Sequence, residues 1–207
     1  MKKWSRRTKW FLGIGAGFGA LFLLFFGSLF LIGYFNLFHA HEHCSKVLGS
    51  ALLMYAHDHE GQYPYHTNGF GDALLLLVKG GELPDVHWIT APGDDGTMYR
   101  RCLTNSLDVP ENQCTRIYIQ GLSESNAADR VALVFDKYPT PGGDHFRHPW
   151  REPTRDVVMS DHFVEWISEK RWPAFAREQI AKLVKLGFEQ PELESLFAVQ
   201  TQQSPTR

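Results

Sequence analysis

The sequence lacks charge in one long segment: no Asp, Glu, Lys or Arg occurs from Phe11 to Phe38, where Leu, Phe, Ile, Gly and Ala predominate. About 20 apolar helical residues span the hydrocarbon core of a bilayer, so the segment is long enough to cross with some tilt. A cleaved signal peptide fits poorly because its apolar core is typically about 7–15 residues long. The nearest cleavage position, Phe38-His39-Ala40, also carries a bulky Phe. We therefore predict a retained transmembrane helix at residues 11–38.

Basic residues lie directly before this segment, at Lys2, Lys3, Arg6, Arg7 and Lys9. Positive residues beside a span are held on the cytoplasmic side. The sequence therefore predicts a single-pass inner (cytoplasmic) membrane protein whose partner is the lipid bilayer. Residues 1–10 form a cytoplasmic basic leader, and residues 39–207 are extracytoplasmic.

The exported part has a deficit of basic residues and lacks familiar enzyme motifs. Without the five basic residues of the leader, 16 of the 21 basic residues remain against 23 acidic ones, so the exported part has a net charge of −7. This balance argues against nucleic acid or anionic lipid headgroups as partners. No Gly-x-Ser-x-Gly, His-Glu-x-x-His or phosphate-binding glycine loop is present. Ser160-Asp161-His162 contains the residue types of a catalytic triad, but neighbours on a strand point to opposite faces. We predict a protein that is not an enzyme and has no cofactor.

Cysteine is scarce, with only Cys44, Cys102 and Cys114. An oxidising compartment favours pairing, and an odd number leaves one thiol over. Cys102 and Cys114 flank a loop rich in Asn, Asp and Pro, which favours a bridge between them. A Cys44–Cys102 bridge is the alternative.

A second helical pattern follows the apolar segment without a break. Its apolar residues have the three–four spacing of one buried helix face, and they are Cys44, Val47, Leu48, Ala51, Leu52 and Tyr55. Gly61 and Pro64 are typical of a helix end. Together the two segments predict one helix of about 50 residues, roughly 75 Å long, transmembrane first and amphipathic second.

The remaining chain predicts short helices and an antiparallel sheet. Asp72 is a candidate N-cap for a helix at Ala73–Lys79, and residues 84–114 have the Pro, Gly and polar content of a loop. The expected strands are Thr115–Gln120, Val131–Phe135, Asp156–Ser160 and Phe163–Ile167, the last two joined by the two-residue turn Asp161-His162.

The C-terminal part predicts helix again, from Pro173 to Gly187, with a further turn or two at Pro191–Val199. Residues 173–199 would form a helical extension, and residues 200–207 a disordered tail. The fold class is α+β, with the long N-terminal helix packed on a small antiparallel sheet and a C-terminal helix.

The order of these parts resembles type IV pilin-like proteins, including the pseudopilins of type II secretion. The helix reads Cys44-Ser45-Lys46-Val47-Leu48-Gly49-Ser50 and ends in Gly61-Gln62-Tyr63-Pro64. Arg101-Cys102 matches a cysteine before a loop, and Asp161-His162-Phe163-Val164 resembles a late Asp-Gly-His-Val segment. The resemblance covers residues 44–167 and implies a pilin-like exported domain at residues 39–172. It also implies contacts with copies of itself or other pilin-like subunits through the N-terminal helix.

The leader departs from the family pattern. The nearest match to a prepilin cleavage site is Gly17-Phe18, and the fifth mature residue would then be Phe22, where the family has Glu. No Glu occurs in the whole apolar segment. An unpaired charge in lipid is costly, so the family's Glu is thought to neutralise a neighbouring subunit's terminal amine. Its absence predicts a relative that stays membrane-bound and unprocessed.

Ten histidines provide weak candidates for a metal site. His39 and His43 share a helix face, and His145-x-x-His148 with His162 forms a second group. Histidines at the headgroup level and structural turn residues explain the same positions. Asp94-Asp95 and Glu111-Asn112 offer oxygens for calcium, although their spacing matches no dedicated calcium loop and is typical of surface turns.

Three functions are consistent with the sequence. The first is a pilin-like structural or assembly subunit of the cell envelope or secretion apparatus. The second is an anchored extracytoplasmic binding module that does not polymerise. The third is a metal-dependent envelope enzyme that uses the histidines.

Overall fold

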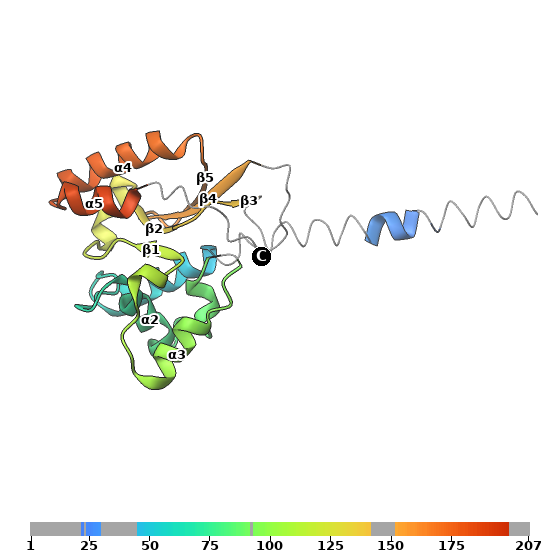
Figure 1. The fold of residues 1–207 in the computed structure, drawn as a ribbon, viewed down its shortest axis with the longest axis horizontal. Helices are drawn as coiled ribbons and strands as arrows, with labels where there is room; N and C mark the ends of the chain where they lie inside the picture. Colours follow the sequence, from blue (N-terminus) through green and yellow to red (C-terminus); the bar gives the residue numbers. More distant parts are fainter. Residues whose placement is uncertain (1–21, 23, 30–44, 92, 142–151, 199–207) are drawn as a thin grey trace, which may run out of the picture. The chain divides into compact units, whose positions relative to one another are not determined.

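The computed structural model describes residues 22, 24–29, 45–91, 93–141 and 152–198 (Figure 1). The chain divides into two compact units, Met1–His39 and Ala40–Arg207. Residues 22 and 24–29 of the first unit are helical and exposed. Within the described ranges, no helix is both long and apolar enough to span a bilayer. The predicted span at residues 11–38 lies largely outside those ranges, as do Gly17 and Phe18 of the predicted cleavage site.

The second unit begins with a helix at residues 45–58, which confirms the amphipathic pattern. Its buried face carries Leu48, Ala51, Leu52 and Ala56, each at most 2% exposed. The helix ends where the Gly61 N–H donates to Ala56 O (2.8 Å) with Gly61 at φ 79°. A positive φ favours glycine, which is why the helix stops there.

One antiparallel sheet forms the centre of this unit. Its strands are β1 (Arg116–Tyr118), β2 (Ala132–Asp136), β3 (Thr140–Pro141), β4 (Pro153–Met159) and β5 (Val164–Ser168). β1 pairs with β2, β2 with β4, and β4 with β5, all antiparallel. Thr154 of β4 pairs with Thr140 of β3 and with Ser168 of β5, so β3 lies on the β2 side of β4. β5 is therefore an edge strand.

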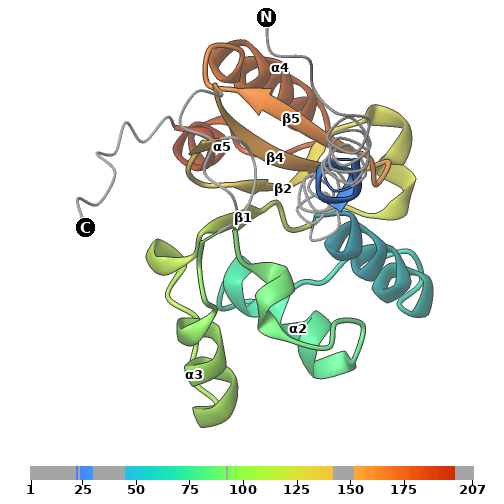
Figure 2. The same ribbon diagram turned by 90° about the vertical axis from the view of Figure 1, so that its right-hand side faces the viewer.

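Helices cover both faces of the sheet, which is why every residue of β2 is buried (Figures 1 and 2). One face packs on the 45–58 helix: a Cβ at Gly49 would lie 3.2 Å from Val158 Cγ1 of β4. On the other face, Phe135 stacks on Phe197 of α5 (Gln190–Phe197) and contacts Trp172 of α4 (Trp172–Lys185). The fold is thus α+β, and the expected C-terminal helix is confirmed.

Three local predictions need correction. The β4–β5 connection is not a two-residue turn, because Met159 N donates to Phe163 O across the loop Ser160–His162. His162 has φ 64°, as the last residue of a three-residue hairpin loop requires. The predicted loop at residues 84–114 contains the helix α3 (Thr97–Asn105) and two short 3-10 helices, η1 (Val86–Ile89) and η2 (Glu111–Gln113).

The third correction concerns α2 (Phe70–Gly80), whose N-cap is Gly69 and not Asp72. Glu111 Oε1 accepts the Phe70 N–H at 2.8 Å, so a distant side chain satisfies this helix start. Asp72 is buried, and its Oδ2 accepts the Val109 N–H at 3.0 Å. Its role is to hold the chain between α3 and η2 against α2.

Candidate functional site

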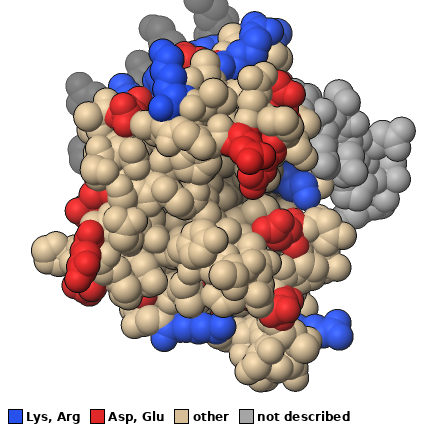
Figure 3. Space-filling model, turned by 90° about the vertical axis from the view of Figure 1, so that its left-hand side faces the viewer, with Lys and Arg blue, Asp and Glu red and all other residues tan. Residues whose placement is uncertain are grey.

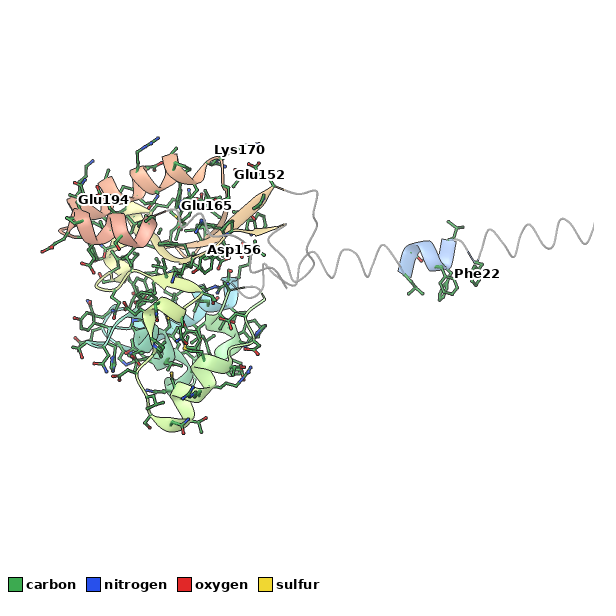
Figure 4. The ribbon with its side chains drawn as sticks, viewed as in Figure 1. Phe22, Glu152, Asp156, Glu165, Lys170 and Glu194 are labelled. Carbon is green, nitrogen blue, oxygen red and sulfur yellow. The ribbon has the colours of Figure 1, made fainter. Side chains whose placement is uncertain are left out.

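The junction between the 45–58 helix and the sheet contains a buried polar network. Ser45, the first described residue of the helix, is fully buried and donates from Oγ to Asp156 Oδ2 of β4 at 2.9 Å. Arg116 Nη2 of β1 donates to the same Ser45 Oγ at 3.0 Å. Arg116 Nε also forms an ion pair with Asp136 Oδ1 at 3.1 Å. Figure 4 shows Asp156 within the unit, between the sheet and the helices on that face.

This network joins three strands to the helix. Asp136 Oδ2 accepts the Asp156 N–H at 3.3 Å, and Arg116 Nη1 donates to Trp88 O at 3.2 Å. Arg116, Asp136 and Asp156 are each at most 2% exposed. Buried charges are tolerated only when paired and hydrogen-bonded. The arrangement thus forms a buried polar junction between the helix and the sheet.

A second buried arginine lies on the opposite sheet face. Arg155 is 1% exposed, its guanidinium lies 4.6 Å from the centroid of the Trp172 ring, and its Nε pairs with Glu169 at 2.9 Å. Its Nη1 donates to the backbone oxygens of Asp136 and Lys137. Sequence reasoning missed both arginines. The available signal was an arginine close to strand-forming residues, next to Ile117 for Arg116 and two residues before Val157 for Arg155. Their partners follow only from the strand register.

The triad residue types at the hairpin do not form a catalytic chain. Ser160 Oγ donates to Asn126 O and accepts the Val131 N–H, both at 3.0 Å. Asp161 pairs with Arg130 Nε at 3.2 Å and caps the Phe163 N–H. His162 Nε2 lies 3.3 Å from Tyr63 Oη. Each side chain is committed to a separate structural partner.

The Tyr63–His162 contact closes the far end of the helix onto the hairpin. Burial, followed by the nearby Glu124 carboxylate, raises the pKa of Tyr63 to about 12. Burial lowers the pKa of His162, while Glu124 and Asp161 oppose that shift. His162 Nδ1 is buried and has no hydrogen-bond partner, which adds to the cost of charging the ring.

The metal predictions find no support in the described residues. Of the candidate ligands, only His162 is described, whereas His39, His43, His145 and His148 lie outside the described ranges. Across the ranges that the structure covers, no group of three or more His, Cys, Asp or Glu side chains could hold a metal ion.

The carboxylates considered for calcium hold turns and helix starts. Asp94 accepts the Gly96 N–H at 2.9 Å and the Thr115 hydroxyl at 2.8 Å, and Asp95 accepts the Thr97 N–H at 2.8 Å. Glu111 caps α2, as described above. The Asn112 backbone oxygen accepts a hydrogen bond from Lys137 Nζ at 3.0 Å.

The predicted Cys102–Cys114 bridge is not formed, because both residues are buried free thiols. Cys102 Sγ donates to Asp108 O, and Cys114 Sγ donates to Pro110 O. Burial raises the pKa of the Cys102 thiol, and it raises the pKa of the Cys114 thiol to about 11. Each thiol therefore acts as a small apolar group in its own pocket. Cys44, the alternative partner, lies outside the described residues.

Two exposed apolar surfaces remain as candidate binding features. Leu53 and Met54, 40% and 56% exposed, lie on the outer side of the 45–58 helix. Phe163 and Trp166, 67% and 48% exposed, lie at the hairpin and on the edge strand β5. On the face shown in Figure 3, acidic and basic side chains are dispersed among uncharged ones. That face is not a single-sign field of the kind that binds polyanions.

Comparisons with known proteins give no family assignment. No protein-family model matches the sequence, and no curated protein or solved structure matches it either.

Proposed function

We propose that the chain is a membrane-anchored, pilin-like structural or assembly subunit of the cell envelope or secretion apparatus, with no enzymatic activity. In this proposal, residues 11–38 span the inner membrane and continue into the 45–58 helix as one long rod. The domain at residues 39–172 stands outside the cytoplasm, with residues 173–199 as its helical extension. The rod contacts copies of the chain or related subunits.

One observation carries the proposal: the helix that follows the apolar segment packs along an antiparallel sheet whose last hairpin touches it. Ser45 bonds to Asp156 at one end. One turn further, a Cβ on Gly49 would lie 3.5 Å from His162 O. This is the helix-on-sheet arrangement that the resemblance to pilin-like proteins implies.

The outer side of the same helix supports a role in assembly. Met54 points away from the buried face and is 56% exposed, and Leu53 beside it is 40% exposed. Exposed apolar residues that cluster on one surface mark interaction sites more often than isolated ones do. In a bundle of rods these two residues would pack against a neighbouring helix.

A photo-crosslinking experiment in native membranes tests the proposal. A photoreactive residue at Met54 should crosslink to a second copy or to another envelope subunit. The matched control is Tyr65, which is 63% exposed but lies beyond the end of the helix. Equal crosslinking from both positions, or none from Met54, would remove the support for assembly through the helix.

A second candidate is an anchored binding module that does not polymerise. It is favoured by the absence of Glu from Phe11 to Phe38, since a pilin-type subunit uses that carboxylate in assembly. N-terminal sequencing of the membrane-extracted protein distinguishes the two. A start at Phe18 indicates pilin-type processing, and an intact Met1 indicates a permanent anchor.

A further inference from the structure

The chain enters the second unit at one defined end of the sheet. Ser45 contacts Asp156, and Asp156 pairs across β4–β5 with Trp166. Ser45 also contacts Arg116, which bonds to Trp88 O and to Asp136, the residue before Lys137. Through Asp156 and Arg116, Ser45 is thus linked to Trp166, to Trp88 and to the residue before Lys137. These three residues therefore lie near the Ser45 end of the sheet.

The tether keeps this end close to the proposed anchor. Only residues 39–44 separate the apolar segment from Ser45. Seven residue steps reach at most about 24 Å when fully extended and about 10 Å as helix. The headgroup layer adds about 5–8 Å on each side of the hydrocarbon core. If the anchor is in the bilayer, the Ser45 end of the unit lies at most about 19 Å beyond the headgroup layer, and within about 5 Å of it when the tether is helical.

The side chains at this end suit a headgroup layer. Trp88 and Tyr138 are partly exposed, and Trp166 is 48% exposed. Lys137 lies 5.6 Å from the centroid of the Tyr138 ring, and the Lys170 side chain is 86% exposed. Trp and Tyr are enriched at the membrane–water interface, where the ring meets apolar chains and its polar atom meets water.

The charge of this end differs from that of the rest of the exported part. Of the described residues near this end, Lys46, Lys137, Lys170 and Arg171 are basic, and Glu152 and Glu169 are acidic. Glu169 is engaged by the buried Arg155, and Lys170 lies 3.6 Å from Glu152. These are four basic residues and two acidic ones, whereas residues 39–207 carry a net charge of −7. The positive excess complements lipid phosphates.

We propose that this proximal end, formed by Trp88, Lys137, Tyr138, Trp166 and Lys170, lies on the lipid headgroups and fixes the orientation of the exported domain. The inference rests on the proposed anchor at residues 11–38. β5 then points away from the membrane at Phe163, which lies about 10 Å from Trp166 and about 17 Å from Ser168 at 3.3 Å per strand residue. The hairpin and the Met54 side of the helix would be presented to partners above the surface.

The test uses the full chain in phosphatidylcholine vesicles that contain a nickel-chelating lipid. A spin label is placed at Lys170→Cys, just after β5, with Phe163→Cys, just before β5, as the matched control. Both variants carry Cys44→Ser, and Cys102 and Cys114 are buried. We expect the headgroup nickel to accelerate relaxation of the label at position 170 several-fold and to leave the label at position 163 nearly unchanged.

The outcomes separate this inference from the proposed function. Vesicle flotation is measured first, and a chain that does not float with the lipid overturns the anchor and this inference together. If the chain floats but both labels respond equally, or neither responds, only the orientation is overturned. Dipolar broadening between labels at position 170, without a nickel effect, would assign this end to a second copy and would also overturn it.

Discussion

Replacing Ser45 by Ala is the sharpest test of how the helix is held on the sheet. Its hydroxyl donates to Asp156 at 2.9 Å and accepts from Arg116 at 3.0 Å, and all three side chains are buried. A hydrogen bond to a charged group contributes about 1.5–3 kcal/mol. Both charged partners keep other contacts, so we expect a combined loss of about 3 kcal/mol in the free energy of unfolding.

The matched control is Ser50→Ala on the same helix. Ser50 is exposed, so the same chemical change there removes no buried contact. Ala is the better helix former, and we expect Ser50→Ala to be neutral or to gain about 0.5 kcal/mol. A loss of 3 kcal/mol is a large fraction of the about 5–15 kcal/mol that stabilises a typical domain.

Thermal unfolding of the full chain, followed by near-UV circular dichroism, measures the difference. At about 2–4 °C per kcal/mol for a chain of this size, Ser45→Ala should lower Tm by about 6–12 °C. A double-mutant cycle with Asp156→Asn should give a coupling energy of about 0.5–3 kcal/mol. Ser45→Ala and Ser50→Ala variants of equal Tm would refute the role assigned to the network.

Three further predictions concern the packing, the hairpin and the thiols. Gly71→Ala should lower the free energy of unfolding by about 1–3 kcal/mol despite the better helix propensity of Ala, because the new Cβ would lie 2.5 Å from Val109 Cγ1 and 3.0 Å from Cys114 Sγ. Gly49→Ala should cost less, because its Cβ would lie 3.2 Å from the nearest neighbouring atom. The reverse order of the two losses in urea unfolding would contradict the packing described. Burial lowers the pKa of His162 in the folded chain, so the unfolded chain binds more protons just below the ordinary value of 6.5 and stability should fall as the pH decreases through that range. His162→Asn, which tolerates the positive φ, should flatten this dependence. Cys102 and Cys114 should resist alkylation in the native protein, and both should react once the protein is denatured without reductant, as mass spectrometry would show. If neither thiol of the denatured protein were alkylated until a reductant was added, the two would be joined by a disulfide, which would contradict the free thiols.

Local sequence patterns were enough to predict these elements: helical spacing for the amphipathic helix and α4, and β-branched and aromatic content for β1, β2 and the β4–β5 pair. In each, several consecutive positions carry the signal, and Gly61 and Gly187 mark helix ends with φ of 79° and 99°. α3 escaped prediction because only Tyr99 and Cys102 of its nine residues are buried. A local signal was nevertheless present, since the Asp94 and Asp95 side chains accept the N–H groups of Gly96 and Thr97 just where the helix starts.

The contacts that define the candidate site could not be derived in the same way. Ser45 and Asp156 are separated by 111 residues in the sequence, and their meeting depends on the register of β4 against β2 and β5. The Cys102–Cys114 expectation failed for a related reason. Loop composition says nothing about where two side chains point, and here each thiol donates to a different backbone carbonyl.

The polar junction explains how an otherwise apolar helix keeps one position on the sheet. Leu48, Leu52 and Ala56 repeat every four residues, so a slip by one helical turn would place similar apolar groups over β4. Ser45 breaks that repeat. After such a slip Gly49 would take the place of Ser45. Asp156 and Arg116 would then lose their shared hydroxyl, at the cost of buried polar groups without partners. A buried polar contact of this kind adds little net stability compared with an apolar one, but it distinguishes the correct register from its neighbours.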